Sequence, residues 1–218
     1  MASFSVAALV DMSRTVLLAS ASASRYSLLS ASGIVPIVQV SHVDEDAIEA
    51  QLSPIATPDL CVALATAKGE AVAAHVTATD VSNLLIIAAD SMLEFEGQSY
   101  GKPETAQNAI ARWTAMRGKS GYLHTGHWVH DTVTGQTRTG VAGARVHFAD
   151  VSDEEITHYV ATGEPLFVAG GFTHEGRSAA YIERMDGDGP AVGGISLNLL
   201  RTFTHEMGIA WHSLWNTP

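Results

Sequence analysis

A cluster of small hydroxyl residues beside an arginine stands near the start of the chain. Residues 16–19 form an apolar run typical of a buried strand, and a helix is predicted from Arg25 to about residue 31. Three serines lie in or beside the connection: Ser20, Ser22 and Ser24. Backbone N–H groups and the dipole at a helix N-terminus favour an anion, and the hydroxyls and the guanidinium add further donors. The pattern predicts an anion site, although an ordinary strand, loop and capped helix fits the same residues.

Lys68 occupies an unusual position for a lysine. Thr57-Pro58 is typical of a helix start, and the alanine-rich sequence that follows predicts a helix to about Ala74. The apolar residues of this helix fall on one stripe, and Lys68 lies in the middle of it. A lysine is rarely buried without a partner. Either its ammonium group reaches water at the edge of the helix, or the stripe borders a cleft where the ammonium meets a phosphate.

Asp90 and Lys102 form the next candidate pair. Residues 84–89 are continuously apolar, which predicts a central strand that ends at Asp90, and ligands bind at such strand ends in open α/β sheets. A hairpin is predicted next, with its turn at Glu96-Gly97. A two-residue loop there would put Ser91 opposite Lys102 and bring Asp90 close to that lysine. The alternative is that Asp90 caps a turn and Lys102 is an exposed charge.

Acidic residues provide candidates for a metal site. Asp44-Glu45-Asp46 follows a predicted strand at residues 35–40. Asp90, Asp44 and Glu45 could supply the oxygen ligands that Mg²⁺ or Mn²⁺ prefers, with substrate phosphates completing the coordination. A run of three acids is also typical of a solvated turn.

Histidines at positions 124, 127 and 130 do not predict a metal site. Residues 122–133 are rich in threonine, valine and aromatic residues, and they predict a strand that pairs with residues 137–148. On a strand, His124 and His130 face one way and His127 faces the other, so a cluster is not expected.

Composition indicates one compact domain at residues 15–218. The chain has 218 residues and 46% apolar content, with a net charge of −11 that argues against nucleic-acid binding but not against a small anionic ligand. Apolar stretches are too short to span a membrane, and residues 1–14 are expected to be a flexible tail without a cleavage signal. Cys61 is the only cysteine, which fits a reducing cytoplasm, and it is expected to be a small core residue.

The order of predicted elements indicates an α/β fold with a mixed sheet. Strands alternate with helices in the first half, and hairpins follow later. A capping box at residues 152–155 opens a helix that ends near Gly163, and a strand is predicted at residues 179–185 before a turn at 186–190. A last helix is expected to begin at Ile195 or Ser196 and to end before Gly208.

Several of these motifs together resemble the Maf family of nucleoside triphosphate pyrophosphatases. Leu18-Ala-Ser-Ala-Ser22, with Arg25 and Leu28-Leu29, is similar to the family signature near the N-terminus. The resemblance then continues in the family's order through later segments, which are Ala67-Lys68, Ile86 to Ser91, Gly101-Lys102-Pro103, Gly118 to Gly121 with Thr125, Glu164-Pro165, Ala169 to Phe172, Glu175-Gly176 and Val192 to Leu197. The resemblance covers about residues 16 to 212, and the motif sequences are similar to those of actinobacterial members.

The resemblance implies a two-lobed fold around a strongly curved mixed sheet, with the substrate in a cleft between the lobes. It also implies hydrolysis of nucleoside triphosphates to the monophosphate and pyrophosphate, which would remove non-standard nucleotides from the pool. Asp90 would be the catalytic acid or base, or a ligand of Mg²⁺ or Mn²⁺, and a homodimer in the cytoplasm is expected. The phosphates would be bound by five residues: Ser20, Ser22, Arg25, Lys68 and Lys102. The alternative is a nucleotide-binding regulator of septum formation without significant turnover.

Three residues are candidates for base selection: Ser24, Ser91 and Glu175. Many family members carry arginine at the position of Ser24, and many of those directed at dTTP and UTP carry glutamine at the position of Glu175. A branch directed at 7-methyl-GTP carries glutamate at the position of Glu175 and a non-basic residue at that of Ser24. A carboxylate only accepts hydrogen bonds, so Glu175 could accept from two N–H groups of a guanine edge. We therefore expect Glu175 to favour guanine-type bases.

Overall fold

The computed structural model of the protein describes residues 14–76 and 83–216. Arg14 belongs to the fold, because its buried guanidinium donates from Nε to Asp131 Oδ1 at 2.7 Å and from an Nη to Oδ2 at 3.1 Å. The rest of the predicted tail, residues 1–13, lies outside the described residues. The folded domain therefore begins by residue 14.

One mixed sheet of seven strands organises the described chain, in the order β2-β1-β3-β5-β6-β7 with β4 paired to β3. β1 runs parallel to β2 and β3, and the other pairs are antiparallel. This confirms the predicted mixed α/β sheet. The strands are β1 (Thr15–Leu18), β2 (Ile37–Val38), β3 (Leu84–Phe95), β4 (Gln98–Tyr100), β5 (Ser120–Asp131), β6 (Thr137–Phe148) and β7 (Ile182–Gly187).

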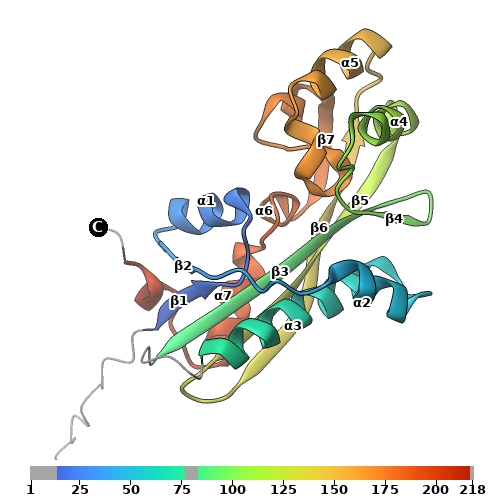
Figure 1. Ribbon diagram of the computed structural model, residues 1–218. Coiled ribbons are helices and arrows are strands. Elements are labelled where there is room, and N and C mark those ends of the chain that lie inside the picture. The colour runs from blue at the N-terminus through green and yellow to red at the C-terminus, as the bar shows by residue number, and fades with distance from the viewer. Residues whose placement is uncertain (1–13, 77–82, 217–218) are drawn as a thin grey trace, which may run out of the picture.

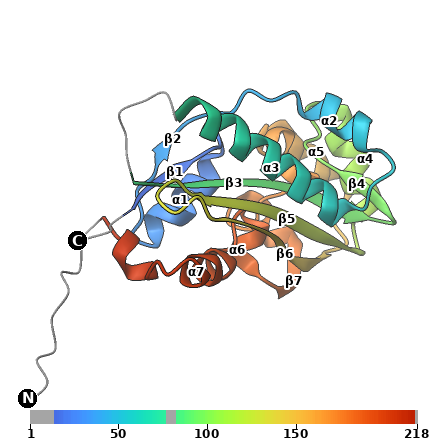
Figure 2. The ribbon, with the colours of Figure 1, turned by 90° about the horizontal axis from the view of Figure 1, so that it is seen from below.

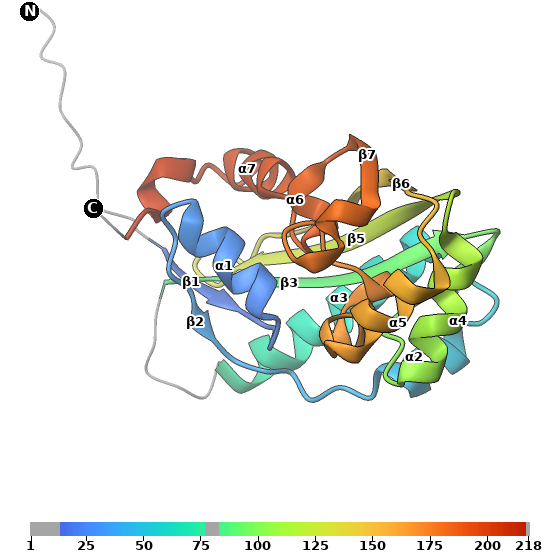
Figure 3. The same cartoon turned by 90° about the horizontal axis from the view of Figure 1, so that it is seen from above.

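Helices cover both faces of the sheet (Figures 1 and 2). α2 and α3 lie on one face, and α1, α6 and α7 lie on the other (Figures 2 and 3). α4 and α5 gather with β7 at the far end of the long strands, so helices group at both ends as the two-lobed expectation requires (Figure 1). The α-helices are α1 (Ala23–Ala31), α2 (Glu45–Leu52), α3 (Thr57–Val76), α4 (Ala106–Met116), α5 (Asp153–Ala161), α6 (Gly189–Val192) and α7 (Leu197–Glu206). None of the described helices is both long and apolar enough to cross a membrane.

Short 3₁₀ helices complete the architecture. They are η1 (Glu164–Phe167), η2 (Ala169–Gly171), η3 (Arg177–Tyr181) and η4 (Trp211–Leu214). The first three belong to the segment between α5 and β7.

The alternation of side chains along β3 separates the cores. Leu84, Ile86 and Ala88 pack in the cluster beneath α3, whereas Leu85 and Ile87 face the cluster formed with α1 and α7. Further along, the strand contributes to the core of α4 and α5. The prediction that this strand ends at Asp90 is wrong, because β5 pairs with it continuously from residue 85 to residue 94. Asp90 thus lies inside a strand.

Several local predictions are confirmed in the second half of the chain. β5 and β6 form the predicted hairpin, and Ser152 and Glu155 make the capping box of α5. Ser196 caps α7, and Gly208 follows that helix with φ of +76°.

The region before α7 differs from the prediction. The strand β7 begins at Ile182, because residues 177–181 form a 3₁₀ helix, and it continues to Gly187 through part of the predicted turn. Asp188 then caps α6 by accepting a hydrogen bond from the Ala191 backbone N–H.

Two glycines let α3 approach the sheet closely. A Cβ on Gly126 of β5 would lie 2.2 Å from the carbonyl carbon of Cys61 in α3. A Cβ on Gly69 of α3 would lie 2.1 Å from the indole ring of Trp128 in β5. Since real Cβ atoms do not make such contacts, larger residues at either position would push the helix away from the sheet.

We predict that Gly126→Ala lowers the free energy of unfolding by about 3 kcal/mol, at the upper end of the cost of overpacking. The Gly189→Ala variant is the matched control, because a Cβ there meets no atom within 4 Å. Chemical denaturation of both variants measures the difference. Equal stabilities would contradict the close packing of α3 on β5.

Candidate active site

A gap on one side of β3 forms the centre of the candidate site. β1 pairs with β3 only as far as Leu18 opposite Ile87, and β4 begins only at Tyr100 opposite Leu93. Between these points, β3 keeps β5 on its other side and, among the described residues, has no strand on this side. Asp90 and Ser91 lie in this gap, and their side chains point to opposite faces of the sheet.

Asp90 lies on the α3 face, where it is paired with Lys68. Lys68 Nζ lies 2.5 Å from Asp90 Oδ1 and 2.8 Å from Glu45 Oε2. Lys68 and Asp90 are only 7% and 6% exposed. Lys68 therefore contacts the buried Asp90 carboxylate and the more exposed Glu45 carboxylate, whose side chain is 44% exposed, instead of extending freely to water.

Burial raises the pKa of the Asp90 carboxyl group, while the positive charges of Lys68 and Arg25 oppose the rise. The carboxylate is thus a better proton acceptor than an exposed aspartate, because a raised pKa moves it towards neutral pH.

Arg25 lies on the opposite face, at the first turn of α1. Its guanidinium donates from Nε to the Gly194 carbonyl at 2.8 Å and from its two Nη atoms to the hydroxyls of Ser20 at 2.9 Å and Ser91 at 3.1 Å. Of its five N–H donors, three are used in this way among the described residues, which leaves two for a ligand. Ser91 also shares a hydrogen bond of 2.8 Å with Thr125. Partial burial lowers the pKa of Arg25, and the charge of Asp90 opposes that change.

The loop before α1 has the geometry expected for an anion site. Ser22 is the N-cap of α1 and accepts a hydrogen bond from the Arg25 backbone N–H. The Ser20 hydroxyl accepts from both the Ser22 backbone N–H and the Arg25 side chain, so its own O–H points away from them as a donor. The first turn of α1 adds backbone N–H groups that have no partner within the helix.

Ser24 and Glu175 lie close together, although they are 151 positions apart in the chain. A hydrogen bond with Ser24 is among the causes that lower the pKa of Glu175, after the larger effect of its contact with His174. His174 Nδ1 lies 2.6 Å from Glu175 Oε2. Two of the three residues predicted to select the base are thus neighbours. The third, Ser91, accepts a hydrogen bond from Arg25, which is the residue after Ser24 in the chain.

Lys102 lies just beyond the last paired residue of the predicted hairpin. The two-residue turn and its register are as predicted, with Phe95 opposite Gln98 and Leu93 opposite Tyr100. Pairing ends at Tyr100, and the Gly101 carbonyl accepts hydrogen bonds from Gly170 and Arg112 instead of pairing with β3. Lys102 is exposed and forms no ion pair within the described residues. It lies on the segment that leaves the sheet at the β4 side of the gap.

The acidic run divides into different roles. Asp44 is the N-cap of α2, where its Oδ1 accepts a hydrogen bond of 3.0 Å from the Ala47 backbone N–H. Glu45 reaches Lys68, so it is not merely part of a solvated turn. Within residues 14–76 and 83–216, no group of three His, Cys, Asp or Glu residues could hold a metal ion by itself.

The histidines of β5 behave as expected for a strand. His127 is buried, and its Nε2 accepts a hydrogen bond of 2.8 Å from the Ser196 backbone N–H at the start of α7. Burial lowers its pKa to about 4, so it is neutral at physiological pH. Cys61 is a buried core residue, and burial raises the pKa of its thiol to about 12. Neither residue has the character of a nucleophile or a metal ligand.

Residues 15–207 match the family model described as Maf-like protein. The chain belongs to the Maf family. A protein of Salinispora tropica named nucleoside triphosphate pyrophosphatase is 45% identical over 92% of this chain and 87% of its own length. A protein of the same name from Streptomyces coelicolor is 46% identical over 93% of this chain and 95% of its own length. These actinobacterial relatives confirm the resemblance found in the motifs.

Among solved structures, the Staphylococcus aureus Ham1 protein aligns with a TM-score of 0.44 and 14% identity, over 89% of this chain and all of that chain.

Several residues make contacts in the site that the sequence around them does not predict. Thr125 and Gly194 meet Arg25 or Ser91 only after folding. His174 was detectable only as the neighbour of Glu175. The pairing of Glu45 with Lys68 depends on how α2 packs against α3, which no local motif indicates.

We predict that Lys68→Met destabilises the fold by about 3 kcal/mol, because Asp90 loses its nearest cation while still buried. Adding Asp90→Asn should restore part of this loss, so that the double variant is more stable than Lys68→Met alone. Denaturation of both single variants and the double variant at pH 7 tests the coupling. Additive losses would contradict a direct interaction between the two charges.

Proposed function

We propose that this protein hydrolyses nucleoside triphosphates to nucleoside monophosphates and pyrophosphate. The observation that carries the proposal is the buried Asp90 carboxylate, which pairs with Lys68 and feels the charge of Arg25 beside the gap in strand pairing along β3. Membership of the Maf family supports it, as do relatives about 45% identical that bear the name nucleoside triphosphate pyrophosphatase.

The cationic groups on both faces of β3 suit a triphosphate. Arg25, Ser20, Ser22 and the first turn of α1 would hold phosphate oxygens on one side, with Lys102 approaching from the β4 side. Such groups stabilise the negative charge that develops on the leaving pyrophosphate, and electrostatic stabilisation of this kind carries much of phosphoryl-transfer catalysis. They provide local positive charge in a chain whose net charge is −11.

Asp90 would act as the general base. It accepts a proton from water as the water oxygen bonds to the α-phosphorus. The bond from the α-phosphorus to the oxygen bridging the β-phosphate then breaks, and pyrophosphate leaves with that oxygen. A raised pKa suits this role, since a base is most effective when its pKa lies near the working pH.

A divalent cation fits the donor set. Asp90 and Glu45 converge on the single ammonium group of Lys68, so two carboxylates lie close enough to share a cation. Mg²⁺ and Mn²⁺ are commonly bound by one or two carboxylates together with substrate phosphates, and such an ion would neutralise phosphate charge. Asp44 is left to cap α2.

We predict that Asp90→Asn lowers kcat by at least about 100-fold, the usual contribution of a general base. The measurement is pyrophosphate release with Mg²⁺ or Mn²⁺ from UTP, dTTP, GTP and 7-methyl-GTP. For the wild type, kcat should fall at acidic pH as Asp90 becomes protonated. Tight binding without turnover of any substrate would overturn the proposal and favour a nucleotide-binding regulator.

Glu175 would favour guanine-type bases. Its contact with His174 and its hydrogen bond with Ser24 lower its pKa, so it is ionised and can only accept hydrogen bonds. We predict that Glu175→Gln reduces the preference for 7-methyl-GTP and GTP over UTP and dTTP by about tenfold or more, as expected when a charged acceptor is lost. The ratios of kcat/KM across the panel test this. An unchanged ranking would refute a role of Glu175 in base selection.

Homodimer formation and a cytoplasmic location stay predictions. The first follows from the family resemblance, and light scattering of the purified chain measures it. The second follows from the reduced single cysteine and the proposed nucleotide substrate.

A further inference from the structure

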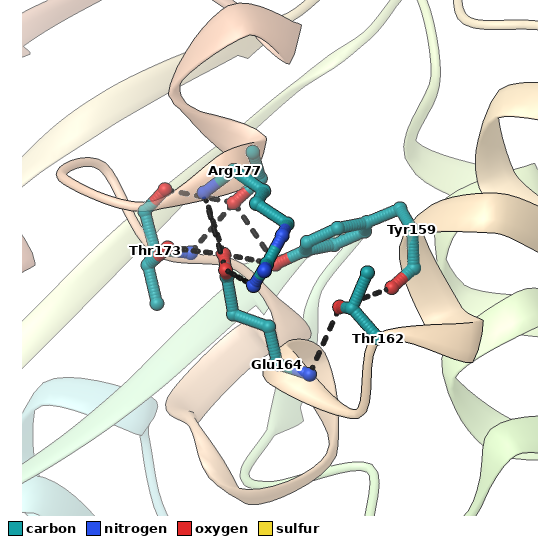
Figure 4. Close-up of polar contacts among 6 residues, drawn as sticks. Tyr159, Thr162, Glu164, Thr173 and Arg177 are labelled. Atoms are coloured by element: carbon teal, nitrogen blue, oxygen red, sulfur yellow. Dashed lines mark hydrogen bonds and ion pairs between the residues drawn. The ribbon is translucent and has the colours of Figure 1, made fainter.

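The segment that carries Glu175 is fastened at both ends to one carboxylate. Glu164, at the start of η1, accepts a hydrogen bond of 2.7 Å at Oε1 from the Thr173 hydroxyl. The same oxygen accepts one of 2.9 Å from the Arg177 backbone N–H. Glu175 lies midway between these two residues, so the points of attachment are only two positions away on either side. Figure 4 shows Thr173 and Arg177 meeting at the Glu164 side chain.

A second set of contacts closes the same segment. The Ser178 hydroxyl accepts a hydrogen bond of 2.8 Å from the Thr173 backbone N–H and donates one of 2.7 Å to the Thr173 carbonyl. The Tyr159 hydroxyl lies 3.0 Å from Ser178 Oγ and 3.2 Å from Glu164 Oε1, and its single proton is shared between these two acceptors. The segment therefore forms a closed loop whose base is tied to α5.

The base of this loop is rigid because it belongs to an aromatic core. The Tyr159 ring makes edge-to-face contacts with Trp113 and Tyr181, at centroid distances of 5.4 Å and 6.0 Å. Burial raises the pKa of Tyr159 well above its usual value, so its hydroxyl stays a hydrogen-bond donor. The base of the loop is therefore held in place by the aromatic core, and His174 and Glu175 lie at the end of the loop away from that base.

Gly176 makes this arrangement possible. A Cβ at this position would lie 2.3 Å from Thr173 Oγ1 and 2.6 Å from Glu164 Oε1. Any other residue would force the hydroxyl and the carboxylate apart. The contact between Glu164 and Thr173 therefore requires glycine at position 176.

We propose that Glu164 is a positioning residue for base selection: by binding Thr173 and Arg177 together, it holds Glu175 beside Ser24. This inference rests on the proposed function, because it concerns the base subsite of the same reaction. Glu164 does not itself touch the substrate. It restricts the loop, so the free-energy cost of ordering Glu175 is met during folding and not during binding.

The electrostatics of Glu164 agree with this role. Burial would raise the pKa of its carboxyl group, but hydrogen bonds from Thr173, Arg177 and their neighbours lower it overall. The group therefore stays ionised at neutral pH and accepts all of these bonds. The Arg177 guanidinium lies 3.3 Å from Glu164 Oε2, and this exposed ion pair adds little to the free energy of folding.

The test is a matched pair of variants at Thr173. Thr173→Val removes the hydroxyl that binds Glu164 and keeps the shape of the side chain, whereas Thr173→Ser keeps the hydroxyl. Each is measured for kcat and KM with the best nucleotide of the panel and with the poorest. Inhibition by inorganic tripolyphosphate, which has phosphates but no base, reports on the phosphate subsite alone.

We expect Thr173→Val to raise KM for the best nucleotide about tenfold, the value of one hydrogen bond of about 1.4 kcal/mol, with little change in kcat. The inhibition constant of tripolyphosphate should stay within about twofold. Thr173→Ser should behave as the wild type, and Glu164→Gln and Gly176→Ala should reproduce the effect of Thr173→Val. An equal loss for nucleotide and tripolyphosphate, or no loss for either, would overturn the proposal.

Hydrogen exchange separates failure of this inference from failure of the proposed function. If the wild type hydrolyses no nucleotide, the proposed function fails, and the same variants are then compared by calorimetric binding of the panel. The backbone amides of residue 173 and Arg177 should exchange faster in Thr173→Val than in Thr173→Ser, while the exchange rates of the α4 amides should be the same in both variants. Unchanged exchange of the loop amides would contradict the positioning role even if the enzyme is active.

Discussion

The buried carboxylate of Asp90 requires a cation, and much of the fold is arranged around supplying one. A carboxylate on a central strand would be protonated if it were isolated in an apolar core. Lys68 prevents this, and it can do so only because α3 lies unusually close to the sheet. Gly126 and Gly69 permit that approach, so two residues without side chains determine where the critical ammonium group lies. The helix that supplies the lysine also seals the core beneath β3, which couples the electrostatics of the site to the packing of the domain.

The gap beside β3 explains how one strand can serve two faces of a site. A fully paired strand would bury its polar groups against neighbours, but within the part of the chain that the structure describes β3 is unpaired on one side between the ends of β1 and β4. Asp90 then meets Lys68 and Glu45 on one face, while Ser91 meets Arg25 on the other. Adjacent residues of opposite orientation thus bring together groups from α1, α2 and α3. The acidic chain as a whole repels anions, and this local concentration of cationic groups is what gives an anion a place to bind.

Sequence patterns predicted the elements better than their ends. Apolar periodicity and capping residues located α1, α3, α5 and α7, because these signals lie within a few residues of one another. The end of β3 was missed, since its continuation depends on pairing with β5, some 35 positions later. The register of the β3–β4 hairpin is as predicted, but the pairing stops before Lys102, because the Gly101 carbonyl accepts a hydrogen bond from Gly170, a partner that local register does not reveal. Ser20, Ser22 and Arg25 lie together as the sequence predicts, because they belong to one loop and one helix start, and their binding of phosphate stays a prediction.

The central claim is that the gap beside Asp90 receives the triphosphate. A crystal structure of Asp90→Asn with the best-bound nucleotide and Mg²⁺ tests it most directly, because this variant should retain the substrate. The account predicts the α-phosphate between residue 90 and Arg25, with the base near Glu175. A separate pocket of about 480 Å³, with a lining that includes His42 and His75, lies away from this gap. Nucleotide bound there, with the gap beside residue 90 empty, would contradict the account.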